Sequence, residues 1–321
     1  MIGGILCCLI PAMTYVFCPS VLLKFYRLWI KICIPAFFLF YLWMVTPGEV
    51  NFYLGPVFVI GCFLPYMPKK WKIIVGFLLV FMLVADLSGR SQVLKAFLAI
   101  CISLLCIFRK FVSDKLLRVA YWLCYIFAIV LLVLGISGTF NIFTDMASNS
   151  GKYVEKKVVN GEFKEEDLST DTRTFIYEEV LQSALRNNYV LCGRSLARGN
   201  DSNYFGASIA EDLKTGKFER YKNELCHLNI FTWLGVVGML LYSLIYFRSS
   251  YLAVYHSNSY FLKLIGVFIA FHWAYGWIED TTKFDILNIS LWSAIGMGLS
   301  SQFRSMTDQD FIEWFGAIFK K

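Results

Sequence analysis

The sequence predicts an all-α polytopic membrane protein with about nine transmembrane helices and one long extracytoplasmic loop that contains a short amphipathic helix. Three observations indicate this fold class. The 321 residues are 58% hydrophobic, 18% aromatic and 17% charged, whereas soluble domains are nearer half apolar and a quarter charged. Apolar runs of ~20 residues, the length that crosses a bilayer, recur along the chain. Basic residues fall in alternate loops between those runs.

Nine apolar runs are the expected spans. The third contains Pro56 and Pro65, so we expect it to be kinked or broken. The first has no basic region before its apolar stretch, which disfavours a cleaved signal peptide. The runs lie at 2–19, 28–46, 51–67, 71–87, 92–108, 118–140, 228–247, 260–278 and 286–303.

The loops between these runs give the topology. One alternate set is rich in basic residues and is expected in the cytoplasm. The other set, at 47–51, 88–91, 141–227 and 279–285, is poor in them and faces outward. This places the N-terminus in the periplasm and the C-terminus in the cytoplasm of a bacterial inner membrane. The net charge of +7 then reflects orientation and contact with anionic lipid, and we expect no nucleic-acid partner.

Four parts follow from this topology. They are helices one to six in 1–140, a periplasmic loop in 141–227, helices seven to nine in 228–303 and a cytoplasmic amphipathic tail in 304–321. The loop has a charged, flexible first part. A helix follows it, capped by Thr170 or Asp171. Its apolar stripe consists of Ile176, Val180, Leu181, Ala184 and Leu185.

The ten cysteines form no disulfide framework and have no metal-ligand spacing. Cys192 and Cys226 border the long loop. They can pair in an oxidising compartment, but two free thiols fit the sequence equally well. The chain also has no Walker, GxSxG or HExxH motif and no paired-Asp metal site, which disfavours ATPases, α/β-hydrolases and zinc proteases. We expect no metal and no cofactor.

Four arginines on the outer side are candidate phosphate ligands, because a guanidinium offers a fixed fork of donors. Arg90 lies in a loop of four residues at the membrane boundary, where a snorkelling arginine is the simpler interpretation. Arg173 opens the predicted loop helix and is otherwise a solvated charge beside Asp171. Arg194 and Arg198 flank turns and either add to an anion site or form a basic surface.

Two groups of residues are candidates to bind or deprotonate a hydroxyl-bearing substrate. His227, at the outer boundary of the seventh span, is suited to act as a general base, and so is Glu224 three residues earlier. Either residue is the base, or Glu224 orients His227. A second set at the end of the eighth span is an aromatic belt with a polar cap or, in the richer interpretation, a rim that contacts sugar. It consists of His272, Trp277, Glu279 and Asp280.

Three motifs carry a resemblance to a known family. They are DLSGRSQ around Arg90, DTRTFIYEEVLQSALRNNYVLCGRS after Asp171, and HLNIFTWLGVVGML with Gly235 and Gly238. In this order, over roughly residues 80–245, the chain resembles the O-antigen ligase and O-antigen polymerase superfamily of bacterial inner-membrane proteins. Glu224, and not His227, stands at about the family's usual distance from the glycine pair. The resemblance implies a GT-C-like fold.

The resemblance also implies a reaction and partners. Members transfer a glycan from undecaprenyl pyrophosphate to a hydroxyl acceptor on the periplasmic side, by a metal-independent, inverting glycosyl transfer. By carry-over, Arg90 and Arg173 hold the pyrophosphate and His227 or Glu224 activates the acceptor. The implied partners are the lipid-linked oligosaccharide, a glycan or lipid A-core acceptor, membrane lipids and a chain-length regulator protein.

We therefore expect a surface-polysaccharide polymerase of O-antigen or capsule type, in preference to a ligase that acts on lipid A core. A transporter or flippase for the same lipid-linked sugar is the alternative from another class. Few ionisable residues lie deep in the spans, Lys95 being near one end, which favours surface chemistry over transport. A membrane scaffold with a binding loop is the third hypothesis, and it would tolerate loss of every named arginine.

Overall fold

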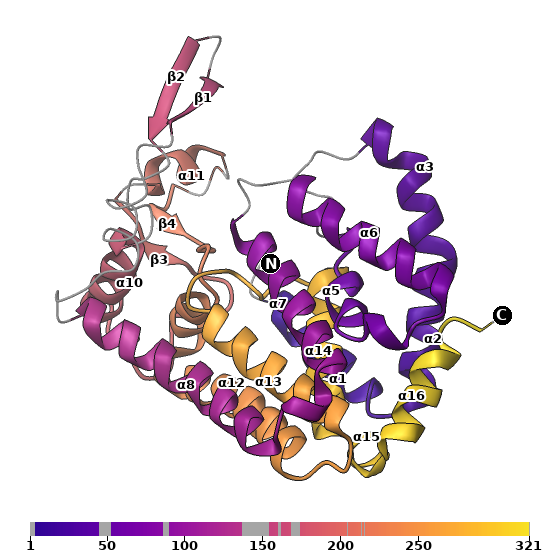
Figure 1. The fold of residues 1–321 in the computed structure, drawn as a ribbon. Coiled ribbons are helices and arrows are strands. Elements are labelled where there is room, and N and C mark those ends of the chain that lie inside the picture. The colour runs from indigo at the N-terminus through magenta and orange to yellow at the C-terminus, as the bar shows by residue number, and fades with distance from the viewer. Residues whose placement is uncertain are drawn as a thin grey trace.

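The computed structural model describes residues 4–44, 53–85, 90–136, 154–159, 162–167, 174–203, 205–212, 214 and 216–320. These residues are mainly helical, which confirms the all-α prediction (Figure 1). The only strands within them are two short antiparallel pairs, both in the region expected to be the long loop.

The first half of the chain begins with short and interrupted helices and ends with three longer ones. The third expected span is broken, as its prolines predicted, into a six-residue helix that starts at Pro56 and a separate turn of 3₁₀ helix. In order, the elements are α1 (Gly4–Tyr15), α2 (Pro19–Leu28), the π-helical η1 (Trp29–Cys33), α3 (Ile34–Met44), α5 (Pro56–Gly61), η3 (Leu64–Tyr66), α6 (Lys69–Ala85), α7 (Arg90–Ile107), η4 (Arg109–Phe111) and α8 (Asp114–Ile136).

The loop region has its own secondary structure. It comprises β1 (Val154–Val159) paired with β2 (Glu162–Asp167), α10 (Thr174–Arg186), β3 (Asn200–Asp201) paired with β4 (Glu219–Arg220), and α11 (Gly206–Asp212).

The predicted loop helix is α10, and its apolar stripe is narrower than expected. Ile176, Val180 and Ala184 are buried, whereas the side chains of Leu181 and Leu185 are 47% and 70% exposed. The buried face of the helix is completed by the polar Glu179 and Ser183, one i, i+4 row beside the apolar one, and not by these leucines.

The second half begins with the longest described helix, α12 (Cys226–Tyr255). It is followed by α13 (Tyr260–Tyr275), α14 (Ile286–Leu299), α15 (Ser301–Ser305) and α16 (Asp308–Ala317). Helix α12 continues to Tyr255, beyond the end of the expected seventh run at 247, so Arg248, which follows that run in the sequence, is helical and not in a loop. Figure 1 shows α10, α11 and the β3–β4 pair toward one end of α8, α12 and α13, with the β1–β2 hairpin projecting beyond α11 and with α15 and α16 near the opposite end.

A sharp bend at Gly235 divides α12. Gly235 has φ +67 and ψ −166, outside the helical region. Sixteen residues of straight helix rise about 24 Å. Yet the Sγ atom of Cys226 lies 3.2 Å from the Oη atom of Tyr242, sixteen positions later. Residues 226–234 therefore fold back beside the first turns of the part that follows the bend.

The segment 190–195 binds the bend through its backbone. Arg194 N donates to Thr232 O at 2.8 Å, and Val236 N donates to Val190 O at 2.9 Å. These bonds satisfy main-chain groups that the broken helix leaves without partners. A Cβ atom on Gly235 would lie 2.3 Å from Leu191 O, so only glycine fits at this position.

Two of the described helices are long and apolar enough to cross a membrane. They are Asp114–Leu134, within α8, and Cys226–Tyr255, which is the bent α12. Three shorter apolar helices are Val93–Ile107, Tyr260–Tyr275 and Ile286–Leu299. Length and composition alone are weak support for a membrane location, since buried helices of soluble proteins share them. The nine-span arrangement is not established by these helices and remains a proposal.

Candidate functional site

The candidate site lies at the end of the helices where the loop elements gather. Three segments meet there: α10, residues 219–229, and the turn between α13 and α14. Tyr177 of α10 donates from Oη to Trp277 O of that turn at 2.5 Å. Cys226 N donates to Glu279 O of the same turn at 3.0 Å. The turn thus holds the start of α12, whose N-cap residue Leu225 provides no side-chain cap.

His227 is fully buried within this region. Its side chain has 0% exposure. Nε2 lies 2.9 Å from Trp273 O, and because a carbonyl only accepts, Nε2 carries the proton. The ring also lies 4.3 Å, centroid to centroid, from the ring of Trp277. Nδ1 has no hydrogen-bond partner among the described residues. This arrangement is that of a packed core histidine.

Glu224 is exposed to solvent, whereas His227 is buried. Its side chain is 62% exposed, and its carboxylate lies 3.8 Å from the Nη2 atom of Arg220. The guanidinium of Arg220 stacks on the ring of Phe205 at 4.5 Å and is largely buried. Burial lowers the pKa of Arg220, partly offset by the charges of Glu224 and Glu179. Glu224 is therefore a carboxylate accessible to a ligand and backed by a buried positive charge.

Arg220 was not among the sequence candidates. Within the part of the chain that the structure describes, its Nη1 atom has no hydrogen-bond partner. Neighbouring Glu219 does not serve it, because successive residues of a strand point to opposite faces and Glu219 is engaged by Arg198. In the sequence, the residue stands out only as a basic residue directly after Phe218 and Glu219.

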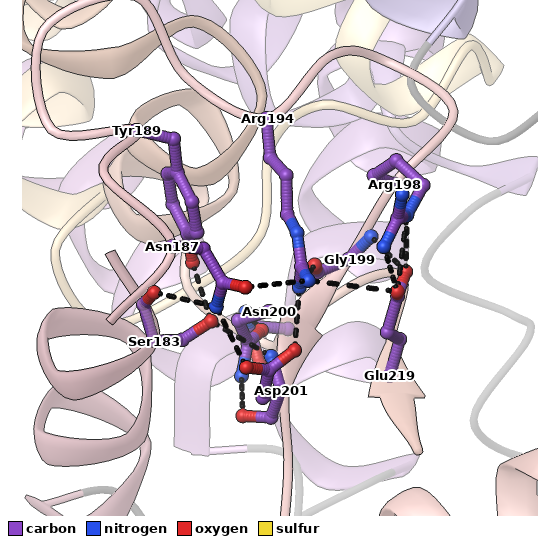
Figure 2. A network of polar contacts seen from close by, with 10 residues as sticks. Ser183, Asn187, Tyr189, Arg194, Arg198, Gly199, Asn200, Asp201 and Glu219 are labelled. Atoms are coloured by element: carbon purple, nitrogen blue, oxygen red, sulfur yellow. Dashed lines mark hydrogen bonds and ion pairs between the residues drawn. The ribbon is translucent and has the colours of Figure 1, made fainter. Parts of the chain in front are cut away.

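Arg194 and Arg198 are engaged by carboxylates (Figure 2). Arg194 donates from Nη1 to Asp201 Oδ1 at 2.6 Å and to Gly199 O at 2.8 Å. Arg198 donates from Nε to Glu219 Oε2 at 2.9 Å and also from Nη2 to the same carboxylate. Both guanidinium groups thereby hold β3 and β4 to the turn before them.

These ion pairs predict that the loop is sensitive to acid. Burial alone raises the pKa of the Asp201 and Glu219 carboxyls, but the bonds and charges of Arg194 and Arg198 outweigh it. Both pKa values are held below the ordinary 3.8 and 4.5. A carboxyl with a depressed folded-state pKa stabilises the fold above its unfolded pKa, and the contribution is lost as the pH falls through the folded pKa.

We expect amide protection of residues 187–201 to be constant from about pH 7 to about pH 5 and to decline progressively below about pH 4, as the pH falls toward the depressed folded-state pKa values. Hydrogen exchange at each pH measures it. Glu219→Gln should lose protection in this segment already at neutral pH. Equal amide protection at about pH 3 and about pH 7 would show that these ion pairs do not stabilise the loop.

The two other candidate arginines are located only by their place in the chain. Arg90 is the first residue of α7, and its side chain is outside the described residues. Arg173 is also outside them, one residue before α10 begins at Thr174. Their phosphate-binding roles stay predictions.

The second candidate set forms ion pairs that the sequence did not indicate. Glu279 Oε2 lies 2.7 Å from the Nζ atom of Lys95 in α7. Asp280 Oδ2 lies 2.7 Å from the Nζ atom of Lys222. His272 is buried, and neither of its ring nitrogens has a hydrogen-bond partner within the described ranges. Lys95 comes from another helix, so no sequence spacing connects it to Glu279.

The two cysteines bordering the loop are both free thiols, Cys192 exposed and Cys226 buried. Among the described residues, no group of three or more His, Cys, Asp or Glu side chains is arranged to hold a metal ion. No protein-family model matches the chain, and no curated protein or solved structure matches it either.

Proposed function

We propose that this chain is a bacterial inner-membrane glycosyltransferase of the O-antigen polymerase and ligase type. It would transfer an oligosaccharide from undecaprenyl pyrophosphate to a sugar hydroxyl on the periplasmic side, with polymerase preferred to ligase. The observation that carries the proposal is the exposed Glu224 carboxylate beside the buried Arg220 guanidinium. They lie just before the start of α12 and near Glu179 of α10, and these two helices belong to two of the family-like motifs.

The membrane placement is supported by the surface of the helices. Large apolar side chains stand exposed along α8, and soluble proteins rarely expose a continuous apolar face of this extent. They include Trp122, Leu123, Ile126, Phe127, Val130 and Val133. Similar side chains are exposed on α6 and on α12 after the bend, including Ile73, Phe77, Leu240 and Leu244. A lipid environment would cover these faces.

In the proposed reaction, Glu224 is the general base. Its carboxylate takes the proton of the acceptor hydroxyl while the hydroxyl oxygen attacks the anomeric carbon of the donor sugar. The bond from that carbon to the pyrophosphate oxygen breaks, and its electron pair leaves with the pyrophosphate. A single displacement of this kind inverts the anomeric centre. The buried ring of His227 is inaccessible to substrate. His227 therefore supports the base only by packing the start of α12, to which it belongs.

The arginines divide into two groups in this proposal. Arg90 and Arg173 would stabilise the charge that develops on the leaving pyrophosphate. Arg194 and Arg198 would shape the loop, because their donors are already engaged by Asp201 and Glu219. A pyrophosphate would have to displace both carboxylates to bind them.

Loss of Arg90 or Arg173 tests the proposal. We expect Arg90→Ala and Arg173→Ala each to abolish long-chain polysaccharide while the protein still inserts at normal levels, because each removes about 10²–10³-fold of transition-state stabilisation. Electrophoresis of surface polysaccharide and an immunoblot of membranes measure the two outcomes. Arg186→Ala is the matched control, since Arg186 is an exposed arginine of the same loop at the far end of α10. Full-length chains in both variants would overturn the proposed site.

A transporter for the same lipid-linked sugar is the second candidate. Two observations favour it: the break in α12 at Gly235 and the buried Lys95–Glu279 pair. Broken helices and intramembrane charges are common in transporters. Purified protein in liposomes containing an undecaprenyl-pyrophosphate-linked oligosaccharide separates the two functions. Formation of glycosidic bonds supports the transferase, and translocation of the lipid without bond formation supports the transporter.

A further inference from the structure

Lys95 is a buried charge that the proposed reaction does not use. It lies in α7, five residues after Arg90, which is about 7.5 Å along a helix axis. The residue is 1% exposed, and its Nζ atom lies 2.7 Å from Glu279 Oε2 and 5.4 Å from the ring centroid of Tyr275. A lysine is almost never buried to this degree without a specific partner. The ion pair therefore fixes one position of the α13–α14 turn against α7.

The same turn holds the start of α12 through its main chain. Glu279 O accepts from Cys226 N at 3.0 Å, and Gly276 O accepts from His227 N at 3.3 Å. The first N–H groups of a helix have no partner within the helix, so these carbonyls take the place of a capping side chain. Glu279 thus contacts α7 with its side chain and α12 with its backbone.

Asp280 extends the contact to the residues around Glu224. Its Oδ2 atom lies 2.7 Å from Lys222 Nζ, and its Oδ1 atom accepts from Asn229 Nδ2 at 3.3 Å. Asn229 in turn accepts from Asn223 N at 2.7 Å and donates to Asn223 O at 2.9 Å. The residues on both sides of Glu224 are held by this chain of contacts, which begins at Lys95.

We propose that the Lys95–Glu279 ion pair is a positioning element that sets α7, which begins at Arg90, relative to the segment that carries Glu224. The inference rests on the proposed function. Lys95 touches neither donor nor acceptor. It acts by holding the leaving-group side and the base side of the site in register, and a misplacement of about 1 Å between such groups costs about 10²-fold in rate.

The test uses the full chain in lipid nanodiscs with three variants: Lys95→Met, Glu279→Gln and the double variant. The donor is the undecaprenyl-pyrophosphate-linked repeat unit extracted from a strain that lacks this chain. We expect each single variant to lower kcat by about 10²-fold per folded molecule, with KM for the donor changed less than about three-fold. The double variant should lose no more than either single variant, because both remove one interaction.

Hydrogen exchange provides a readout that does not depend on catalysis. Amides of residues 222–229 should exchange at least about ten-fold faster in Lys95→Met, while those of α14 stay unchanged. Lys263→Met is the matched control. It removes another lysine–carboxylate pair, with Asp114, from the other end of α13 and should change neither measurement.

Two outcomes overturn the inference. In one, kcat per folded molecule stays at the wild-type value and only the yield of folded protein falls, which is the behaviour of a purely structural pair. In the other, losses in the double variant are the product of the single losses. An inactive wild-type protein would refute the proposed function, and selective exchange at 222–229 would still decide whether Lys95 is coupled to the start of α12.

Discussion

Glu224→Gln is expected to lower kcat for glycan transfer by about 10²–10⁴-fold, the usual contribution of a general base, without lowering the melting temperature. The glutamine keeps the shape and the acceptor oxygen of the side chain but takes no proton at neutral pH. Because the Glu224 side chain is 62% exposed, the substitution opens no cavity. Turnover with the lipid-linked donor and thermal unfolding of the same preparation measure the two effects.

His227→Gln is the counterpart that decides between the two candidate bases. The glutamine amide can donate to Trp273 O as Nε2 of the histidine does at 2.9 Å. We expect the variant to be less stable, because it loses ring contacts with Trp277, yet to retain most of its activity per folded molecule. A stable, inactive His227→Gln protein together with an active Glu224→Gln protein would assign the base to His227.

Gly235→Ala is expected to be among the most destabilising single-methyl additions in the described part of the chain. The new Cβ would lie 2.3 Å from Leu191 O and 2.5 Å from Gly193 N, neither of which belongs to a flexible side chain. It would also be strained at φ +67. Overpacking and backbone strain together should cost about 3–5 kcal/mol. Thermal unfolding, and faster proteolysis within residues 187–201, would report it.

Gly216→Ala separates the strain from the collision. Gly216 has φ +63, a positive φ like that of Gly235, but nothing lies within 4 Å of its added Cβ. We expect a cost of about 1 kcal/mol, from the left-handed backbone alone. Equal losses of stability for the two alanine variants would show that the segment 190–195 does not bind the bend.

The sequence allowed the helical class to be predicted because apolar runs and helix-forming residues agree along most of the chain. It also indicated the break after Pro56, where each proline removes a main-chain donor. It did not indicate the bend at Gly235, since glycine in an apolar helix is common and its positive φ depends on contacts with residues 190–195. The broad stripe on α10 was wrong for a related reason: Leu181 is 47% exposed, whereas the polar Glu179 and Ser183 are buried.

The sequence indicated most of the candidate site residues but not the role of each one. Residue type and position marked Glu224, His227, Arg194 and Arg198, but burial decides between the first two, and burial is a property of the folded chain. The carboxylate that engages Arg198 belongs to Glu219, more than twenty positions away. Lys95 and Glu279 are separated by most of the sequence, so only the packing of α7 against the α13–α14 turn brings their charges together.

The bend at Gly235 has a consequence for depth in the proposed bilayer. After the bend, residues 236–255 alone measure about 30 Å, one hydrocarbon thickness. Residues 226–234 would then be a half-helix that rises from the level of Tyr242 to the bend alongside them. Tyr242 lies about 9 Å below the bend at 1.5 Å per residue, and Cys226 is level with it. Acceptor sugars would therefore have to enter a recess beneath the headgroups to meet the reactive carbon of the donor.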